Sequence, residues 1–134
     1  MKELEIISKT VKINNSDERI FSFLSDFRNI SKIIPPDVQD WSATENACSF
    51  VVKGQKMSLV IIDREPFKTI KITGEDGSPY KFFFWLQLKS LSVYETAARM
   101  VVHAELNLMM RTAVKKPLQQ GLDQFADYLK LLPY

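Results

Sequence analysis

The chain has 134 residues, 46% of them hydrophobic and 25% charged, which is the composition of one globular domain and excludes a disordered chain. Its 18 basic and 16 acidic residues leave a net charge of only +2; they form no basic stripe interleaved with aromatic residues, so nucleic acid is not expected as a partner, and an anionic membrane surface has no better support. Cys48 is the single cysteine, and the N-terminus lacks the apolar run of a signal peptide, so we expect a cytoplasmic protein. No apolar run is long enough to span a bilayer, so we expect no membrane insertion.

Residues 1–134 contain no linker, repeat or low-complexity tract, so we expect a single domain. It is predicted to begin with a strand over residues 3–13. Asn15 is expected to cap the short helix that follows, with Glu18 as its capping-box partner. A second short helix is expected to begin after Asp26 and to end at Pro35–Pro36, because neither proline can continue the helical hydrogen bonds.

The middle of the chain is predicted to be a series of antiparallel strands, because apolar and polar residues alternate there with period two. Short turns at residues 54–56 and 74–77 connect several of these strands, and parallel strands would need much longer crossovers. The predicted strands cover residues 41–43, 48–53, 57–65, 69–73, 80–89 and 93–106.

A long amphipathic helix is predicted to follow these strands, between Asn107 and Pro133. Pro117 inside it is expected to bend the helix so that it follows the sheet, and a hinge is the alternative. One long helix on a curved antiparallel sheet gives an α+β fold with a concave apolar space between the two layers. Apolar residues recur at helical spacing at Met110, Val114, Leu118, Leu122, Phe125, Leu129 and Leu132.

The element order and four segments resemble the START-like superfamily of polyketide cyclases/dehydrases and lipid-transport proteins (SRPBCC), which includes the birch-pollen-allergen-like proteins. The resemblance is nearest to small bacterial polyketide-cyclase-like members. It implies a helix-grip fold: a curved antiparallel sheet of six to seven strands wrapped around the C-terminal helix, with two short helices between the first two strands. The segments are VKINNSDERIFSFLSDF (11–27), PPDVQDW (35–41), DREPFKTIKIT (63–73) and AELNLMMRTAVKKPL (104–118).

The sequence offers few residues for catalysis. His103 is the only histidine, which excludes a histidine triad or a multi-histidine metal site, and the alternation places it on the outer face of its strand. Cys48 alternates with Phe50 and is expected to be a small buried hydrophobic residue and not a nucleophile. Asp26 is expected to cap a helix. We therefore expect neither a metal nor another cofactor.

The leading hypothesis is a non-catalytic domain that binds or transports a small hydrophobic molecule, such as a lipid, a quinone or an aromatic metabolite, in a cavity between the sheet and the C-terminal helix. The superfamily that the chain resembles includes such binders, aromatic cyclases and hydrolase-activating co-chaperones, so the resemblance does not choose among these functions. The expected lining is Phe27, Ile34, Trp41, Phe50, Met57, Leu59, Ile61, Ile72, Phe82, Phe84, Leu86, Met100, Val102, Met110, Val114, Leu118 and Leu122.

Two alternatives remain open. A cyclase or hydratase would need an acid, base or amide inside the cavity, supplied by residues such as Asp26, Asp63, Tyr80 or Arg99. A co-chaperone-like protein-binding module or a homodimer would need an exposed apolar surface. Phe83 and Trp85 could provide it, because they alternate with the inward residues of their strand; burial under a chain terminus is the other explanation.

Overall fold

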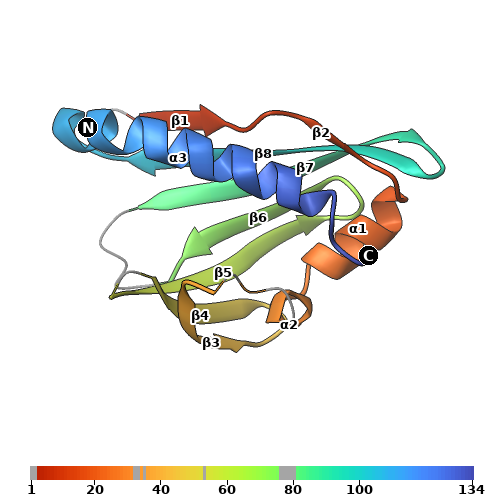
Figure 1. The fold of residues 1–134 in the computed structure, drawn as a ribbon, viewed down its shortest axis with the longest axis horizontal. Coiled ribbons are helices and arrows are strands. Elements are labelled where there is room, and N and C mark those ends of the chain that lie inside the picture. The colour runs from red at the N-terminus through yellow and green to blue at the C-terminus, as the bar shows by residue number, and fades with distance from the viewer. Residues whose placement is uncertain (1–2, 32–33, 35, 53, 76–80) are drawn as a thin grey trace.

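The computed structural model describes residues 3–31, 34, 36–52, 54–75 and 81–134. It confirms the predicted α+β helix-grip architecture: one curved antiparallel sheet, two short helices near the N-terminus, and one long C-terminal helix that crosses the sheet (Figure 1). The elements are β1 (Glu3–Ile7), β2 (Val11–Ile13), α1 (Asp17–Leu24), α2 (Phe27–Ile30), β3 (Val38–Ala43), β4 (Ala47–Val52), β5 (Gln55–Glu65), β6 (Thr69–Gly74), β7 (Phe82–Ser92), β8 (Glu95–Glu105) and α3 (Leu108–Leu129).

The sheet follows the order β1-β8-β7-β6-β5-β4-β3, and β2 also pairs with β8. All neighbouring strands are antiparallel, as the short turns predicted. The sheet has eight strands and not six or seven, because the single strand expected over residues 3–13 is divided into β1 and β2.

Ser8 is the reason for this division. Its N–H donates to the carbonyl of Met100 at 2.8 Å, and its Oγ accepts from the Met100 N–H at 2.8 Å. Ser8 Oγ also donates to the carbonyl of Lys9 at 2.9 Å. The hydroxyl thus replaces a backbone partner of β8, and the chain shifts its register before Val11 pairs with Ala98.

The observed strand limits differ from the predicted ones by a few residues. β3 begins at Val38 and not at Trp41, and β5 begins at Gln55, so the turn before it is shorter than expected. Gly54 occupies this turn with φ +76°, a backbone conformation that glycine adopts without steric cost. Parts of the predicted elements at Ile33, Pro35, Lys53, Asp76–Gly77 and Tyr80 lie outside the described residues.

The two short helices have polar N-caps. Ser16, not Asn15, caps α1: its Oγ accepts from the Arg19 N–H at 3.2 Å. The Asn15 prediction is therefore wrong; that side chain instead accepts from the Ser16 N–H at 2.8 Å. Asp26 caps α2 as predicted, because its carboxylate accepts from the Arg28 N–H at 2.9 Å.

The helix α3 is capped by Asn107, whose side chain accepts from the Met110 N–H at 2.8 Å. Polar contacts tie its second half to the chain between β1 and β2. The Lys9 N–H donates to Asp123 at 2.7 Å, Lys9 Nζ pairs with Asp127 at 2.6 Å, and Gln119 donates to the carbonyl of Ile7 at 2.9 Å. Among the described residues, no helix has the length and apolarity needed to cross a bilayer.

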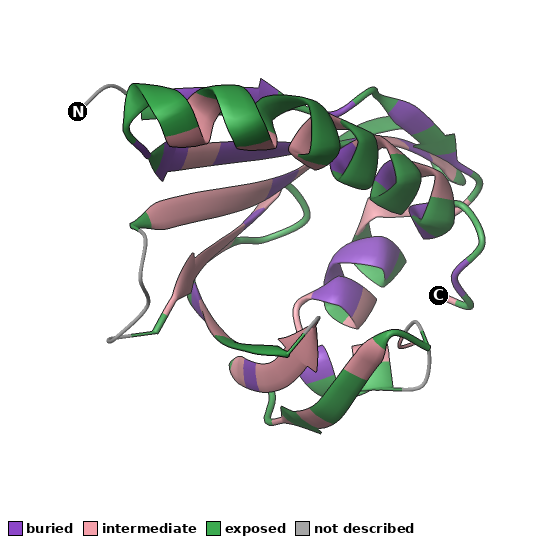
Figure 2. Ribbon diagram, turned by 60° about the vertical axis from the view of Figure 1, so that its left-hand side comes forward, coloured by how far each residue is buried: buried purple, intermediate pink, exposed green. Residues whose placement is uncertain are grey.

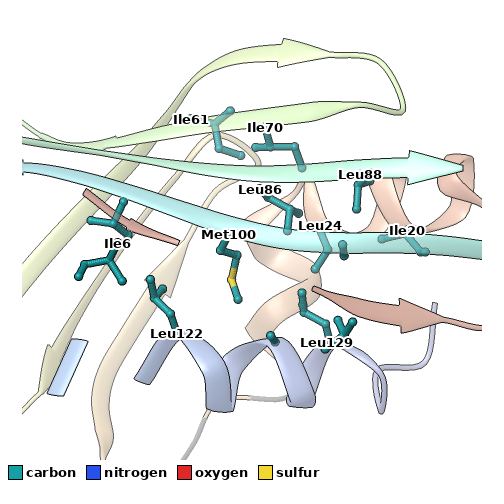
Figure 3. Packing of buried hydrophobic residues seen from close by; sticks show 14 of the residues in the cluster. Ile6, Ile20, Leu24, Ile61, Ile70, Leu86, Leu88, Met100, Leu122 and Leu129 are labelled. Atoms are coloured by element: carbon teal, nitrogen blue, oxygen red, sulfur yellow. The ribbon is translucent and has the colours of Figure 1, made fainter. Parts of the chain in front are cut away.

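The core lies between the inner face of the sheet, the second half of α3 and the short helix α1. Leu122, Ala126 and Leu129 are the buried residues of α3. Figure 3 shows Leu122 and Leu129 reaching from α3 toward Met100 on β8. Met100 is fully buried. In the first half of α3, Met110, Val114 and Leu118 are only partly buried, so that half covers a less densely filled part of the fold (Figure 2).

Candidate functional site: a cavity between the sheet and the C-terminal helix

A cavity of about 1140 Å³ lies between the inner face of the sheet and α3. Its wall combines residues of both short helices, of β3 to β8 and of α3. Figure 2 shows how the sheet curves away from α3 on this side. The volume is slightly above the roughly 300–1,000 Å³ of most small-molecule pockets, so a drug-sized molecule fits inside.

The structure brings most of the expected lining residues together on this wall. They reach it because the inward positions of neighbouring strands align: Phe84 pairs with Val102 on one side and with Ile72 on the other. The expected residues on the wall are Phe27, Ile34, Trp41, Phe50, Met57, Leu59, Ile72, Phe82, Phe84, Leu86, Val102, Met110, Val114, Leu118 and Leu122.

Two expected lining residues lie elsewhere. Ile61 and Met100 are not on the wall; both are buried in the core. Met100 is enclosed on every side, with no exposed surface. Ile61 precedes an irregularity in the pairing of β5 with β6, and its N–H donates to Asn46. The alternation of β5 is regular up to Ile61, so this residue keeps the inward face but packs into the core beyond the wall.

Several wall residues were not predicted. Many of them continue the faces that were predicted, so period-two alternation could have found Cys48, Ile70, Ala104 and Leu106. Gln55, Lys56 and Glu75 had no such signal, because they lie where turns were expected, and Ser58 lies on the predicted strand at a position between inward residues. The additional wall residues are Leu24, Ile30, Val38, Cys48, Gln55, Lys56, Ser58, Ile70, Glu75, Ala104, Leu106, Ala113, Pro117, Phe125 and Leu129.

The polar groups of the wall are concentrated at one region. Gln55, Lys56 and Ser58 lie at the start of β5, and Glu75 follows β6. The two segments are adjacent, since the Glu75 N–H donates to the carbonyl of Ser58 at 3.1 Å. Gln55, Lys56 and Glu75 are exposed, so this region borders solvent. The remaining wall is apolar apart from Cys48.

The opening of the cavity has two sides, which we call the sheet lip and the helix lip. The sheet lip is formed by the exposed wall residues Gln55–Met57 and Glu75. The helix lip is formed by the exposed wall residues Ala113, Pro117 and Phe125 of α3. An apolar molecule can thus enter between the first half of α3 and the β4–β5 hairpin.

Cys48 faces the cavity but is a poor nucleophile there. Burial raises the pKa of its thiol to about 12, and the nearby Glu75 carboxylate acts in the same direction. The thiolate, which is the reactive form, is therefore scarce at neutral pH. In the described part of the chain, no group of three or more His, Cys, Asp and Glu side chains is placed to hold a metal ion.

Asp26, Asp63 and Arg99, the other candidates among the described residues, lie away from the wall. Arg28 donates to the Asp26 carboxylate at 2.7 Å and lowers the pKa of that carboxyl group. Asp63 is exposed on β5. Arg99 is exposed and donates to Gln87 at 2.7 Å, on the face opposite the cavity. Tyr80 lies outside the described residues.

His103 lies on the outer face of the sheet, as the alternation predicts. Its two ring nitrogens lie 2.9 Å from Glu3 and 2.5 Å from Glu5. Its ring meets Trp85 edge-on at a centroid distance of 4.8 Å. The contacts of His103 are therefore made with neighbouring strands and not with the cavity.

Phe83 and Trp85 also lie on this outer face, where both rings are partly buried. Their centroids are 5.9 Å apart, and Lys71 Nζ lies 4.6 Å from the Phe83 ring and 5.2 Å from the Trp85 ring. These contacts are within the range of cation–π attraction. The structure thus partly covers the aromatic pair with side chains of the same chain.

Comparison with known proteins identifies the fold through solved structures. No family profile and no curated protein sequence matches the chain. A START superfamily protein from Mycobacterium smegmatis is similar, with a TM-score of 0.62, 17% identity, and coverage of 95% of this chain and 98% of that one. Norcoclaurine synthase from Thalictrum flavum has a TM-score of 0.76 at 11% identity, covering 96% of this chain and 92% of the enzyme.

A third similar structure is the Aha1 dimer from Colwellia psychrerythraea, with a TM-score of 0.59, 18% identity, and coverage of 90% and 96% of the two chains. Identities this low carry information on the fold and not on the activity. The similarity extends over nearly the whole of each chain and includes the sheet, the short helices and the long C-terminal helix. The chain therefore has the START-like, SRPBCC fold.

Proposed function

We propose that residues 1–134 form a single domain that binds or transports a small hydrophobic molecule, such as a lipid, a quinone or an aromatic metabolite, without reacting with it. The observation that supports this proposal is the cavity of about 1140 Å³ with a wall that is apolar except at one border and at Cys48. Removing apolar ligand surface from water provides the free energy of binding at roughly 25 cal/mol per Å². A cytoplasmic location stays a prediction.

The test begins with the protein as purified. Native mass spectrometry and solvent extraction should detect a co-purified molecule, and a panel of lipids, quinones and aromatic compounds should raise the melting temperature of the stripped protein. Val114→Trp should reduce this shift, because residue 114 is on the wall. Thr112→Trp is the matched control on the exposed side of the same helix. No co-purified molecule and no thermal shift with any compound would refute the proposal.

An enzyme acting on a hydrophobic substrate is the second candidate function. It is supported by Lys56 and Glu75, two ionisable residues of the cavity wall, and by the fold shared with norcoclaurine synthase. A ligand that is recovered chemically unchanged after prolonged incubation argues for binding alone. Conversion that is lost in Glu75→Gln, with binding retained, would favour the enzyme.

A third candidate is a contact between two copies of the chain, or with another protein in a co-chaperone-like role, through Phe83 and Trp85. It is supported by the position of both rings on the outer face. Sedimentation velocity over a range of concentrations should show a dimer for the wild type and a monomer for Trp85→Ser. A monomer in both cases would exclude the dimer.

A further inference from the structure

The basic side chains around the cavity opening differ from most others in the molecule. Lys9, Lys12 and Lys68 each pair with an acid, and Lys71 lies over two aromatic rings. Within the described residues, no ion pair or side-chain hydrogen bond involves the basic residues beside the opening, Lys56, Arg111, Lys115 and Lys116.

These bases lie on the sheet lip and on the segment of α3 that contributes to the helix lip. Lys56 belongs to the sheet lip. Arg111, Lys115 and Lys116 lie on the part of α3 that contributes Met110, Ala113, Val114 and Pro117 to the wall. Residues 108–122 of α3 include no acid at all. Figure 1 shows the start of α3 and the β4–β5 hairpin at the same end of the molecule.

One acid opposes these bases. Glu75 is the only acidic residue among the described wall residues, and it forms no ion pair with Lys56 within 4.0 Å. Among the described residues, Lys56 and the bases on the adjoining segment of α3 outnumber this acid, and charges of one sign attract ligands of the opposite sign. Beyond the opening, the deep wall, formed by residues such as Leu24, Phe27 and Leu129, offers no charged partner.

We infer that the ligand is an anionic amphiphile, with its apolar chain or ring system inside the cavity and its carboxylate or phosphate at the opening beside Lys56. This inference rests on the proposed binding function and specifies its ligand class. In this orientation the charged group keeps its contact with water and gains an ionic contact with the Lys56 ammonium. The reverse orientation would bury an anion among apolar side chains without a partner, which is strongly unfavourable.

The chain provides its own probe for the experiment. Trp41 lines the cavity and stacks on Phe50 at 5.7 Å, whereas Trp85, the second of the two tryptophans, lies on the outer face. In a Trp85→Phe background, tryptophan fluorescence therefore reports from the cavity alone. Stripped protein is titrated with dodecanoate, methyl dodecanoate and dodecylamine, which share one chain length and differ in the charge of the head group.

Dodecanoate should bind about tenfold more tightly than its methyl ester, the factor expected for one charge-assisted contact, and dodecylamine should bind more weakly than either. Lys56→Gln should remove the preference for the acid, so that the acid and the ester bind this variant with similar affinity. Lys89→Gln is the matched control, because Lys89 is exposed on β7 and is not on the wall. Higher salt should weaken dodecanoate binding and spare the ester.

The outcomes separate the ligand class from the binding function. Equal affinities for acid and ester, or a preference for the acid that survives in Lys56→Gln, would overturn the anionic head group and leave the proposed hydrophobic binding intact. If none of the three compounds changes the fluorescence, this inference fails. If the broader ligand panel fails as well, the binding function fails with it.

Discussion

The cavity predicts that two chemically identical substitutions will have very different effects on stability. Met100→Ala removes a side chain that is fully buried in the core. Met110→Ala removes one that is partly buried and borders the cavity. Because both changes remove Cγ, Sδ and Cε, a difference between them reports on the surroundings of each side chain and not on its chemistry.

The expected magnitudes follow from these surroundings. For Met100, losing three buried groups at roughly 0.8 kcal/mol each costs about 2.4 kcal/mol. The new hole in a closed core raises the total to about 2–5 kcal/mol. Met110→Ala enlarges a space that already exists and improves helix propensity, so its cost should stay below about 1 kcal/mol.

Urea unfolding of the stripped protein, followed by circular dichroism, measures both free energies of unfolding. Thermal unfolding gives a second measure, at roughly 3–5 °C per kcal/mol for a chain of this length. Equal losses of 2 kcal/mol or more, by the estimate for a closed core, would contradict the reasoning. They would mean that side chains fill the space beneath the first half of α3 in solution.

Three further outcomes follow from individual side chains. Ser8→Ala should cost about 1–3 kcal/mol in urea unfolding, because it leaves the buried N–H of Met100 without its side-chain partner; a change within error would mean that water or a backbone shift replaces the hydroxyl. Arg28 lowers the pKa of Asp26, so the stability from this contact is present above the ordinary carboxyl pKa of 3.8 and is lost as the pH falls through the lowered value. Asp26→Asn, which keeps an N-cap, should therefore be less stable than the wild type at neutral pH and equally stable in acid. A difference in the free energy of unfolding that persists in acid would refute this. Since burial raises the pKa of Cys48 from 9.0 to about 12, its thiolate fraction near pH 8 falls roughly a thousandfold; iodoacetamide should label the native protein far more slowly than the unfolded one, and equal rates would contradict the assigned burial.

The sequence was sufficient for the fold because its periodicities are long and regular. The stripe from Met110 to Leu129 defines α3, and the alternation through Phe84 and Val102 defines the inner face of the sheet. The interruption of the first strand could also have been predicted from the sequence, although a single strand over residues 3–13 was expected. Leu4 and Ile6 are inward at even positions and Val11 and Ile13 at odd ones, and such a change of phase requires an interruption.

The polar border of the cavity could not be predicted in this way. Lys56 lies on β5 and Glu75 follows β6, so the two residues come to one region only through the pairing of β5 with β6. Neither belongs to an apolar pattern, and isolated charged residues on strands are ordinary surface residues by composition. Charge counting along the chain found no basic stripe, because Lys56 and the bases at the start of α3 belong to one end of the molecule only after folding.

The attachment of α3 has a mechanical consequence. Its second half contains the buried Leu122, Ala126 and Leu129 and the polar ties to Ile7 and Lys9. The first half, up to Pro117, covers the cavity and contains no buried residue. The second half of the helix is thus held by buried side chains and polar ties, whereas the first half is held by its two-residue connection to β8 and by partly buried apolar side chains. In the described part of the chain, moving the first half outward would separate partly buried apolar contacts, which an entering ligand replaces, while the polar ties of the second half stay intact.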